Sequence, residues 1–141
     1  MPPSSYCQEH YPDDPAILDE VQLLRRVPRR HFFWDENLGR TRPSSAAFED
    51  DTDREPMSVY RRNILEVESG GVARVMMGHE GFALAGLAAS EFRVQGQSIH
   101  PEPVPDEPAH TVVCGDKPER VRKLFAKRAL WVIEPPEQGR S

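Results

Sequence analysis

Cysteine is scarce in this sequence, and the two cysteines stand far apart. Cys7 lies near the N-terminus and Cys114 in a segment of strand type, within a chain of 141 residues. Small secreted domains that depend on disulfides carry several cysteine pairs at short spacings. We therefore expect no disulfide framework, and a chain suited to the reducing cytoplasm.

Long apolar runs are missing as well. No stretch approaches the roughly 18 apolar residues that a membrane-spanning helix requires, so we expect no membrane partner. The N-terminus has neither the basic region nor the apolar region of a signal peptide. Its first 20 residues hold five acids and four prolines but no lysine or arginine. This composition predicts a disordered acidic leader over 1–20, which either keeps the protein soluble or docks on a basic partner.

The short motifs of several chemistries are also absent. In HEGFA (79–83), Ala83 stands where a zinc-protease helix needs a second histidine. His110 and Cys114 are four residues apart, but on a strand this spans about 13 Å, too far for one ion. The sequence has no Gly-x-Ser-x-Gly elbow and no glycine-rich phosphate loop. We expect neither a metal nor a cofactor.

The hydrophobic patterns that are present predict a single α+β domain over 21–133, followed by a flexible tail over 134–141. A small mixed or antiparallel sheet is expected, with two or three helices packed on it. The expected strands are 21–27, 72–77, 82–87 and 109–115. The expected helices run from Ser58 to about Val67, from 88 to about Val94, and from a cap at Asp116 to about Ala129.

Outside the leader, charge of one sign does not prevail. Removing the five leader acids from the total of 23 leaves 18 acidic residues against 18 basic ones. A neutral domain is not expected to attract nucleic acid as a whole. One segment, RRVPRRHFFW (25–34), nevertheless combines arginines with aromatics that can stack on bases. The alternative is that its aromatics belong to the core and its arginines pair with the acids of 49–55. The nucleic-acid candidates are Arg25, Arg26, Arg29, Arg30 and Trp34.

Two enzymatic hypotheses rest on the serines of RPSSAAF (42–48). Ser44 is a candidate nucleophile, for which His79 or His110 would act as the base. Alternatively, Arg42 clamps an anion beside the serines with His110 opposite, as in a site for a phosphate-bearing compound. The bland alternative is that the serines satisfy backbone groups at a turn. The ligand-binding candidates are Arg42, Ser44, Ser45, Ser58 and His110.

Read in order, LLRRVP, RPSSAAFEDD, MSVY, GHEGFALAGLAA and EPAHTVVCG resemble a family of small uncharacterised bacterial proteins. The resemblance covers about 24–133 and implies no activity. It implies that six residues belong to one surface: Arg42, Ser44, Ser45, Ser58, His79 and His110. We expect a cytoplasmic binding or accessory module that acts through contacts with another protein. The alternatives are a small enzyme or ligand-binding domain for a phosphate-bearing, nucleotide-like compound, and a nucleic-acid-binding protein.

Overall fold

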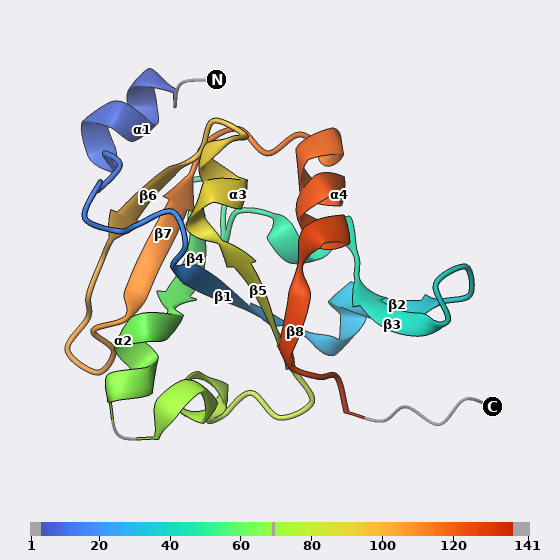
Figure 1. Cartoon of the computed structure of the whole chain (residues 1–141). Coiled ribbons are helices and arrows are strands. Elements are labelled where there is room, and N and C mark those ends of the chain that lie inside the picture. Colours follow the sequence, from blue (N-terminus) through green and yellow to red (C-terminus); the bar gives the residue numbers. More distant parts are fainter. Residues whose placement is uncertain (1–3, 69, 137–141) are drawn as a thin grey trace.

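A six-stranded antiparallel sheet forms the centre of the computed structural model, which describes residues 4–68 and 70–136 (Figure 1). The strand order is β6-β7-β4-β1-β5-β8, and neighbouring strands are antiparallel throughout. A separate hairpin of β2 and β3 projects from one side of the body (Figure 1). The strands are β1 Gln22–Val27, β2 Phe32–Asp35, β3 Arg40–Pro43, β4 Met57–Arg61, β5 Ala83–Ala88, β6 Ser98–Pro101, β7 His110–Cys114 and β8 Leu130–Ile133.

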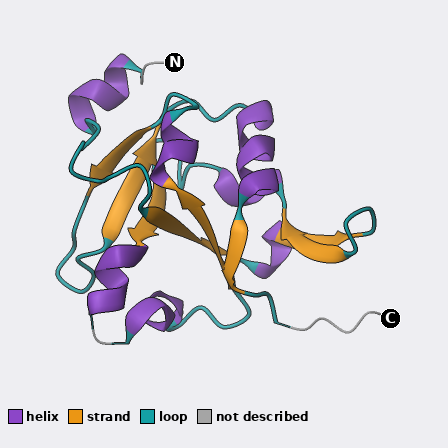
Figure 2. Cartoon of the chain, viewed as in Figure 1, coloured by secondary structure: helices purple, strands orange, loops and turns teal. Residues whose placement is uncertain are grey.

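Short helices cover the sheet and connect its strands (Figure 2). The α-helices are α1 Ser5–His10, α2 Arg62–Val67, α3 Ala89–Arg93 and α4 Glu119–Arg128, and the 3-10 helices are η1 Arg29–His31, η2 Ser45–Phe48 and η3 Gly71–Met76. Together with the antiparallel sheet they make a single α+β domain, which confirms the predicted fold class.

The sheet has an apolar core on each face. Strand alternation sends Leu23 of β1 to one face and Leu24 to the other. On the first face, α4, α3 and η2 bring together the rings of Phe125, Phe92 and Phe48, with centroids 4.8 Å and 6.1 Å from that of Phe125. On the second face, α2 and η3 cover a smaller core.

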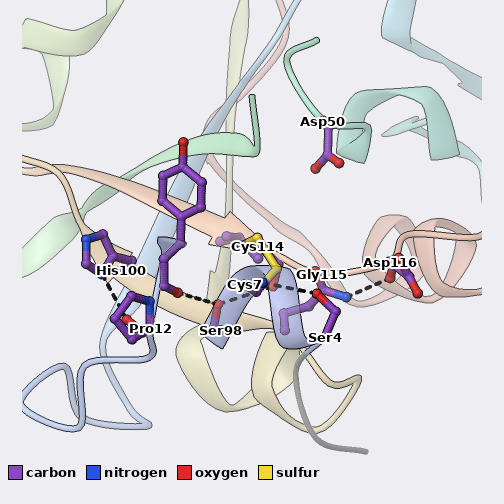
Figure 3. Close-up of a disulfide and its surroundings, with 12 residues drawn as sticks. Ser4, Cys7, Pro12, Asp50, Ser98, His100, Cys114, Gly115 and Asp116 are labelled. Atoms are coloured by element: carbon purple, nitrogen blue, oxygen red, sulfur yellow. Dashed lines mark hydrogen bonds between the residues drawn. A yellow bond between two sulfur atoms is a disulfide. The ribbon is translucent and has the colours of Figure 1, made fainter. Parts of the chain in front are cut away.

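Residues 4–20 are packed on the domain, so the prediction of a disordered leader is wrong for them. Cys7 is only 2% exposed and forms a disulfide with Cys114 of β7 (Figure 3). Ile17 is buried in the first core. The acids of this segment also find a partner within the chain, because Arg93 pairs with Asp13 and Asp19.

The disulfide corrects a second expectation. The cysteines are 107 residues apart in sequence, yet their Cα atoms lie 5.7 Å apart, a distance that a disulfide spans without distortion. Sequence separation therefore says nothing here about spatial separation. The expectation of a reducing cytoplasm rested on unpaired cysteines, and the bonded pair removes that basis, since disulfides persist in oxidising compartments.

Three local predictions also change. The expected strand at 72–77 is the 3-10 helix η3, because Val72, Val75 and Met76 are spaced to place apolar side chains on one helical side. Ser58 lies inside β4, so the helix that it was expected to cap begins at Arg62. The helix that was expected to begin from a cap at Asp116 is α4, which begins after Pro118 without a side-chain cap. The flexible tail was predicted over 134–141, and its residues from 137 onwards lie outside the described part of the chain.

None of the described helices has both the length and the apolar character needed to cross a membrane.

Candidate functional site

The candidate residues divide between two clefts. The first, here called the hairpin cleft, lies between the β2–β3 hairpin and α4 and has a volume of about 710 Å³. It is lined by Phe33, Asp35, Asn37, Leu38, Arg40, Arg42, Ser44, Ser45, Lys123, Ala126 and Lys127. The second, the arginine–histidine cleft, has a volume of about 550 Å³. It is lined by Arg25, Arg26, Pro28, Arg30, His31, Ala46, Glu49, Asp50, Asp51, Ser58, Tyr60, His79, Phe82 and His110.

Arg42 is held rigidly in the hairpin cleft. The β2–β3 register places Phe33 directly opposite Arg42, and the guanidinium carbon lies 4.5 Å from the centroid of the Phe33 ring. The Nε atom of Arg42 donates to the carboxylate of Asp35 at 2.5 Å, and Nη1 donates to the carbonyl oxygen of Pro43. The hydrogen bond from Arg42 lowers the pKa of Asp35. The hairpin therefore presents a positioned guanidinium rather than a freely rotating one.

The hairpin cleft is basic and partly apolar. Four cations line it against the single carboxylate of Asp35, which Arg42 already engages. Phe33 and Leu38 add apolar surface, being 41% and 55% exposed. Such a cleft is suited to a ligand that combines negative charge with apolar groups.

Ser44 and Ser45 line this cleft without a histidine beside them among its lining residues. The backbone of Ser44 closes a turn, since its N–H donates to the carbonyl of His31 and its carbonyl accepts from the N–H of Ala47. His79 and His110 both line the other cleft. The proposed Ser44–histidine pair and the proposed Arg42–Ser44–His110 clamp are therefore not assembled in this structure.

Ser58 and His110 do meet, in the arginine–histidine cleft. They come from the adjacent strands β4 and β7, and Nε2 of His110 lies 3.1 Å from Oγ of Ser58. Asp51 Oδ2 lies 2.5 Å from the same hydroxyl, while Nδ1 of His110 lies 2.9 Å from the carbonyl oxygen of Glu102. The family resemblance implied one surface for six residues, and Ser58, His79 and His110 share one cleft.

The Ser58 hydroxyl has one hydrogen and two neighbours that compete for it. Burial raises the pKa of Asp51, but hydrogen bonds from Ser58 and Arg25 outweigh burial and leave this pKa below its usual value. An ionised Asp51 accepts the hydroxyl hydrogen of Ser58. A base that activates Ser58 would have to accept that same hydrogen. With the hydrogen directed to Asp51, His110 is not placed to take it from Ser58.

The predicted nucleic-acid strip is not continuous. Arg25 and Arg26 line the arginine–histidine cleft, whereas Trp34 lies half-buried on the hairpin. Arg29 and Arg30 are exposed on η1. Of the four arginines, only Arg25 pairs with an acid of the 49–55 loop among the described residues. The alternative interpretation of 25–34 was that its aromatic residues belong to the core, and Phe32 is indeed buried in the first core.

Several cleft residues were not among the sequence candidates. Lys123 and Lys127 lie one turn apart on α4, and Arg40 lies on β3. The basic character of 120–128 is visible in the sequence, but its position opposite the hairpin is not. Asp51 belongs to a run of acids that by sequence indicates only a solvated loop. No group of three or more metal-ligating side chains is placed to hold an ion within the described part of the chain.

No protein-family model matches the chain, and neither a curated protein nor a solved structure matches it significantly.

Proposed function

We propose that the protein is a binding module that holds an acidic segment of a partner protein in the hairpin cleft. The observation that carries this proposal is the charge of the cleft, in which four cations face one carboxylate that is itself paired. The domain as a whole is balanced in charge, so a local excess of this kind acts on a ligand that enters the cleft.

The chemistry of the lining supports a peptide ligand. Arginine and aromatic side chains contribute much of the binding energy at protein interfaces. Here the guanidinium of Arg42 stacks on Phe33, and exposed Leu38 lies at the hairpin tip. An acidic segment with one or two apolar residues would satisfy both the charges and this apolar surface.

Preorganisation also supports binding. Asp35 and the Pro43 carbonyl fix the guanidinium of Arg42, so little side-chain entropy remains to be lost when a ligand binds. Lys123 and Lys127 are four residues apart on α4 and therefore share one side of the helix. The cations thus come from two separate elements and can grip a segment from both sides.

The other functions considered from the sequence have weaker support. An enzyme acting through Arg42, Ser44 and His110 needs these residues in one site, and His110 lines a different cleft. A nucleic-acid-binding surface needs a longer basic strip than the neutral domain offers.

The proposal is tested by fluorescence anisotropy with a labelled decapeptide rich in Glu, Asp and Leu, beside its Gln and Asn counterpart. We expect the acidic peptide to bind and the amide peptide to bind at least about 10-fold more weakly, with strong salt dependence. Lys127→Glu should weaken binding about 10-fold, since it reverses a cleft charge. Arg120→Glu is the matched control, because Arg120 is exposed on the same helix and does not line the cleft.

Two outcomes would overturn the proposal. One is equal weakening by the Lys127 and Arg120 substitutions, which would indicate attraction to overall charge rather than to the cleft. The other is tighter binding of a single-stranded DNA 12-mer than of the acidic peptide, which would favour the nucleic-acid hypothesis.

A further inference from the structure

Arg25 and Arg26 are adjacent on β1 but are used in different ways. In Arg25 all three guanidinium nitrogens donate to the chain: Nε to the carbonyl of Ala47, Nη2 to that of Glu49, and Nη1 to Asp51 and the carbonyl of Ser58. These hydrogen bonds attach the 47–51 segment to the sheet and leave no guanidinium nitrogen of Arg25 without a partner. Arg25 is therefore structural.

Arg26 uses only one of its three nitrogens in this way. Nη1 donates to the carbonyl of Val75 at 3.0 Å and to Nε2 of His79 at 2.6 Å. The guanidinium carbon lies 5.1 Å from the centroid of the Tyr60 ring. Nε and Nη2 have no hydrogen-bond partner within residues 4–68 and 70–136. These two atoms carry parallel N–H groups on one edge of the guanidinium, a fork that matches two oxygens of a phosphate.

The positive charge of Arg26 is not neutralised by a described residue. The three acids of the cleft are already engaged, Glu49 with Arg122, Asp50 with Lys117 and Asp51 with Arg25. His79 cannot neutralise Arg26, because an imidazole ring is either neutral or cationic. Burial and the charge of Arg26 lower the pKa of His79, which disfavours a second positive charge beside Arg26. Arg30, a second cation of the cleft, likewise makes no ion pair with the described part of the chain.

We infer that the arginine–histidine cleft binds the phosphoryl group of a small organic phosphate, which the open fork of Arg26 grips with Arg30 as the second cation. Two unpaired cations fit a dianion better than the single charge of a carboxylate. The cleft volume of about 550 Å³ lies within the range of small-molecule sites. Tyr60 and Phe82 supply aromatic walls for the organic part of the ligand. This site is separate from the hairpin cleft and does not depend on the function proposed for it.

Isothermal titration calorimetry with phenyl phosphate, inorganic phosphate and benzoate tests this inference. Phenyl phosphate should bind best, inorganic phosphate more weakly because it lacks the ring, and benzoate at least about 10-fold more weakly than phenyl phosphate. Arg26→Gln should weaken phenyl phosphate binding by about 10-fold or more, the usual effect of losing a charge-assisted pair. Arg29→Gln removes the same charge from an exposed neighbour outside the cleft and should leave the affinity within about twofold.

Arg26→Lys tests whether phenyl phosphate is bound by the paired N–H groups of the guanidinium or only by its positive charge. It keeps the cation but has no parallel N–H pair, so its affinity should stay close to that of Arg26→Gln. Arg30→Gln provides a second variant on an exposed side chain, for use if the Arg26 variants lose their folded circular dichroism spectrum, and should weaken binding severalfold.

The inference is overturned if the wild-type protein binds no phenyl phosphate at concentrations on the order of 10 mM. It is also overturned if benzoate binds as tightly as phenyl phosphate, or if Arg29→Gln and Arg30→Gln change the affinity for phenyl phosphate equally. Tighter binding of a phosphoserine peptide than of phenyl phosphate would overturn the assignment to a small molecule.

Discussion

The Sγ atoms of Cys7 and Cys114 are bonded across 107 residues of sequence, which fastens α1 to the end of β7 (Figure 3). A six-residue helix is too short to be stable alone. The segment that follows it lies along β6, where Ser98 Oγ donates to the carbonyl of Tyr11 and His100 Nδ1 contacts that of Pro12. The disulfide therefore adds a covalent attachment to a segment that these polar contacts and the buried side chain of Ile17 also hold.

Cys7→Ser should lower the free energy of unfolding substantially. The chain-entropy model gives about 4.7 kcal/mol for a loop of about 100 residues, as an upper value. Thermal melting with and without reductant checks this expectation. The wild-type Tm should fall on reduction, whereas that of Cys7→Ser should not change. If the wild-type Tm stays unchanged although two free thiols titrate after reduction, the disulfide does not stabilise the fold and the prediction is wrong.

Arg93→Gln should loosen the same N-terminal segment. Arg93 donates to Asp13, Asp19 and the carbonyl of Asp14, so its loss removes the ionic attachment of 13–19. We expect a stability loss of roughly 1 kcal/mol, because the pairs are partly exposed. Limited proteolysis under reducing conditions should cut this segment faster in Arg93→Gln than in Arg120→Gln, an exposed arginine on α4. Equal cleavage rates would assign the attachment to Ile17 alone.

The elements that the sequence predicted correctly are those whose information is local. The patterns in 21–27 and 82–87 reflect strands that pack on the cores of both sheet faces, and the periodicity after Asp116 reflects a helix with one face on a core. Strands β1 and β5 and helix α4 lie there. The Cys7–Cys114 bond depends on where two distant segments meet, which no local pattern encodes. The short apolar segment at 72–77 fitted strand and helix alike, and packing against Leu65 and Leu84 decided for η3.

The candidate functional residues were also predictable only as far as local sequence patterns reach. Sequence reasoning selected residues that do line clefts, such as Arg42 and His110, but assigned them to one surface. Strand order separates them, because His110 lies on β7 within the main sheet while Arg42 lies on the hairpin. The division of labour between Arg25 and Arg26 follows from which carbonyls each side chain reaches. That information exists only in the folded chain.

Gly86→Ala should destabilise the sheet although alanine is a small residue. A Cβ at position 86 would lie 3.1 Å from Cγ2 of Val132 and 3.2 Å from Cδ2 of Leu24. Both contacts are in the second core, where overpacking costs about 1–3 kcal/mol. Urea unfolding should show a lower midpoint with an unchanged slope. A midpoint at or above the wild-type value would mean that β8 shifts freely to make room.

Asp51→Asn should change how stability depends on pH. The folded-state pKa of Asp51 lies below its usual value, which is that of the unfolded chain. Its carboxylate therefore contributes stability that is fully present above the unfolded value of about 3.9 and is lost as pH falls through the folded value. The amide side chain of the variant does not titrate, so the variant should be less stable at pH 7 by about 1–3 kcal/mol and should lose less stability on acidification.

Urea midpoints measured from about pH 7 down to about pH 2.5 test this expectation, with the difference between wild type and Asp51→Asn narrowing below about pH 4. Asp53→Asn is the control, because Asp53 is exposed in the same loop. The urea midpoint of Asp53→Asn should change with pH as that of the wild type does. If the midpoint of Asp51→Asn also follows the wild type at every pH, the hydrogen bonds from Ser58 and Arg25 do not stabilise the ionised carboxylate. The Ser58 hydroxyl would then be free to donate to His110, and the case against Ser58 as a nucleophile would lose its basis.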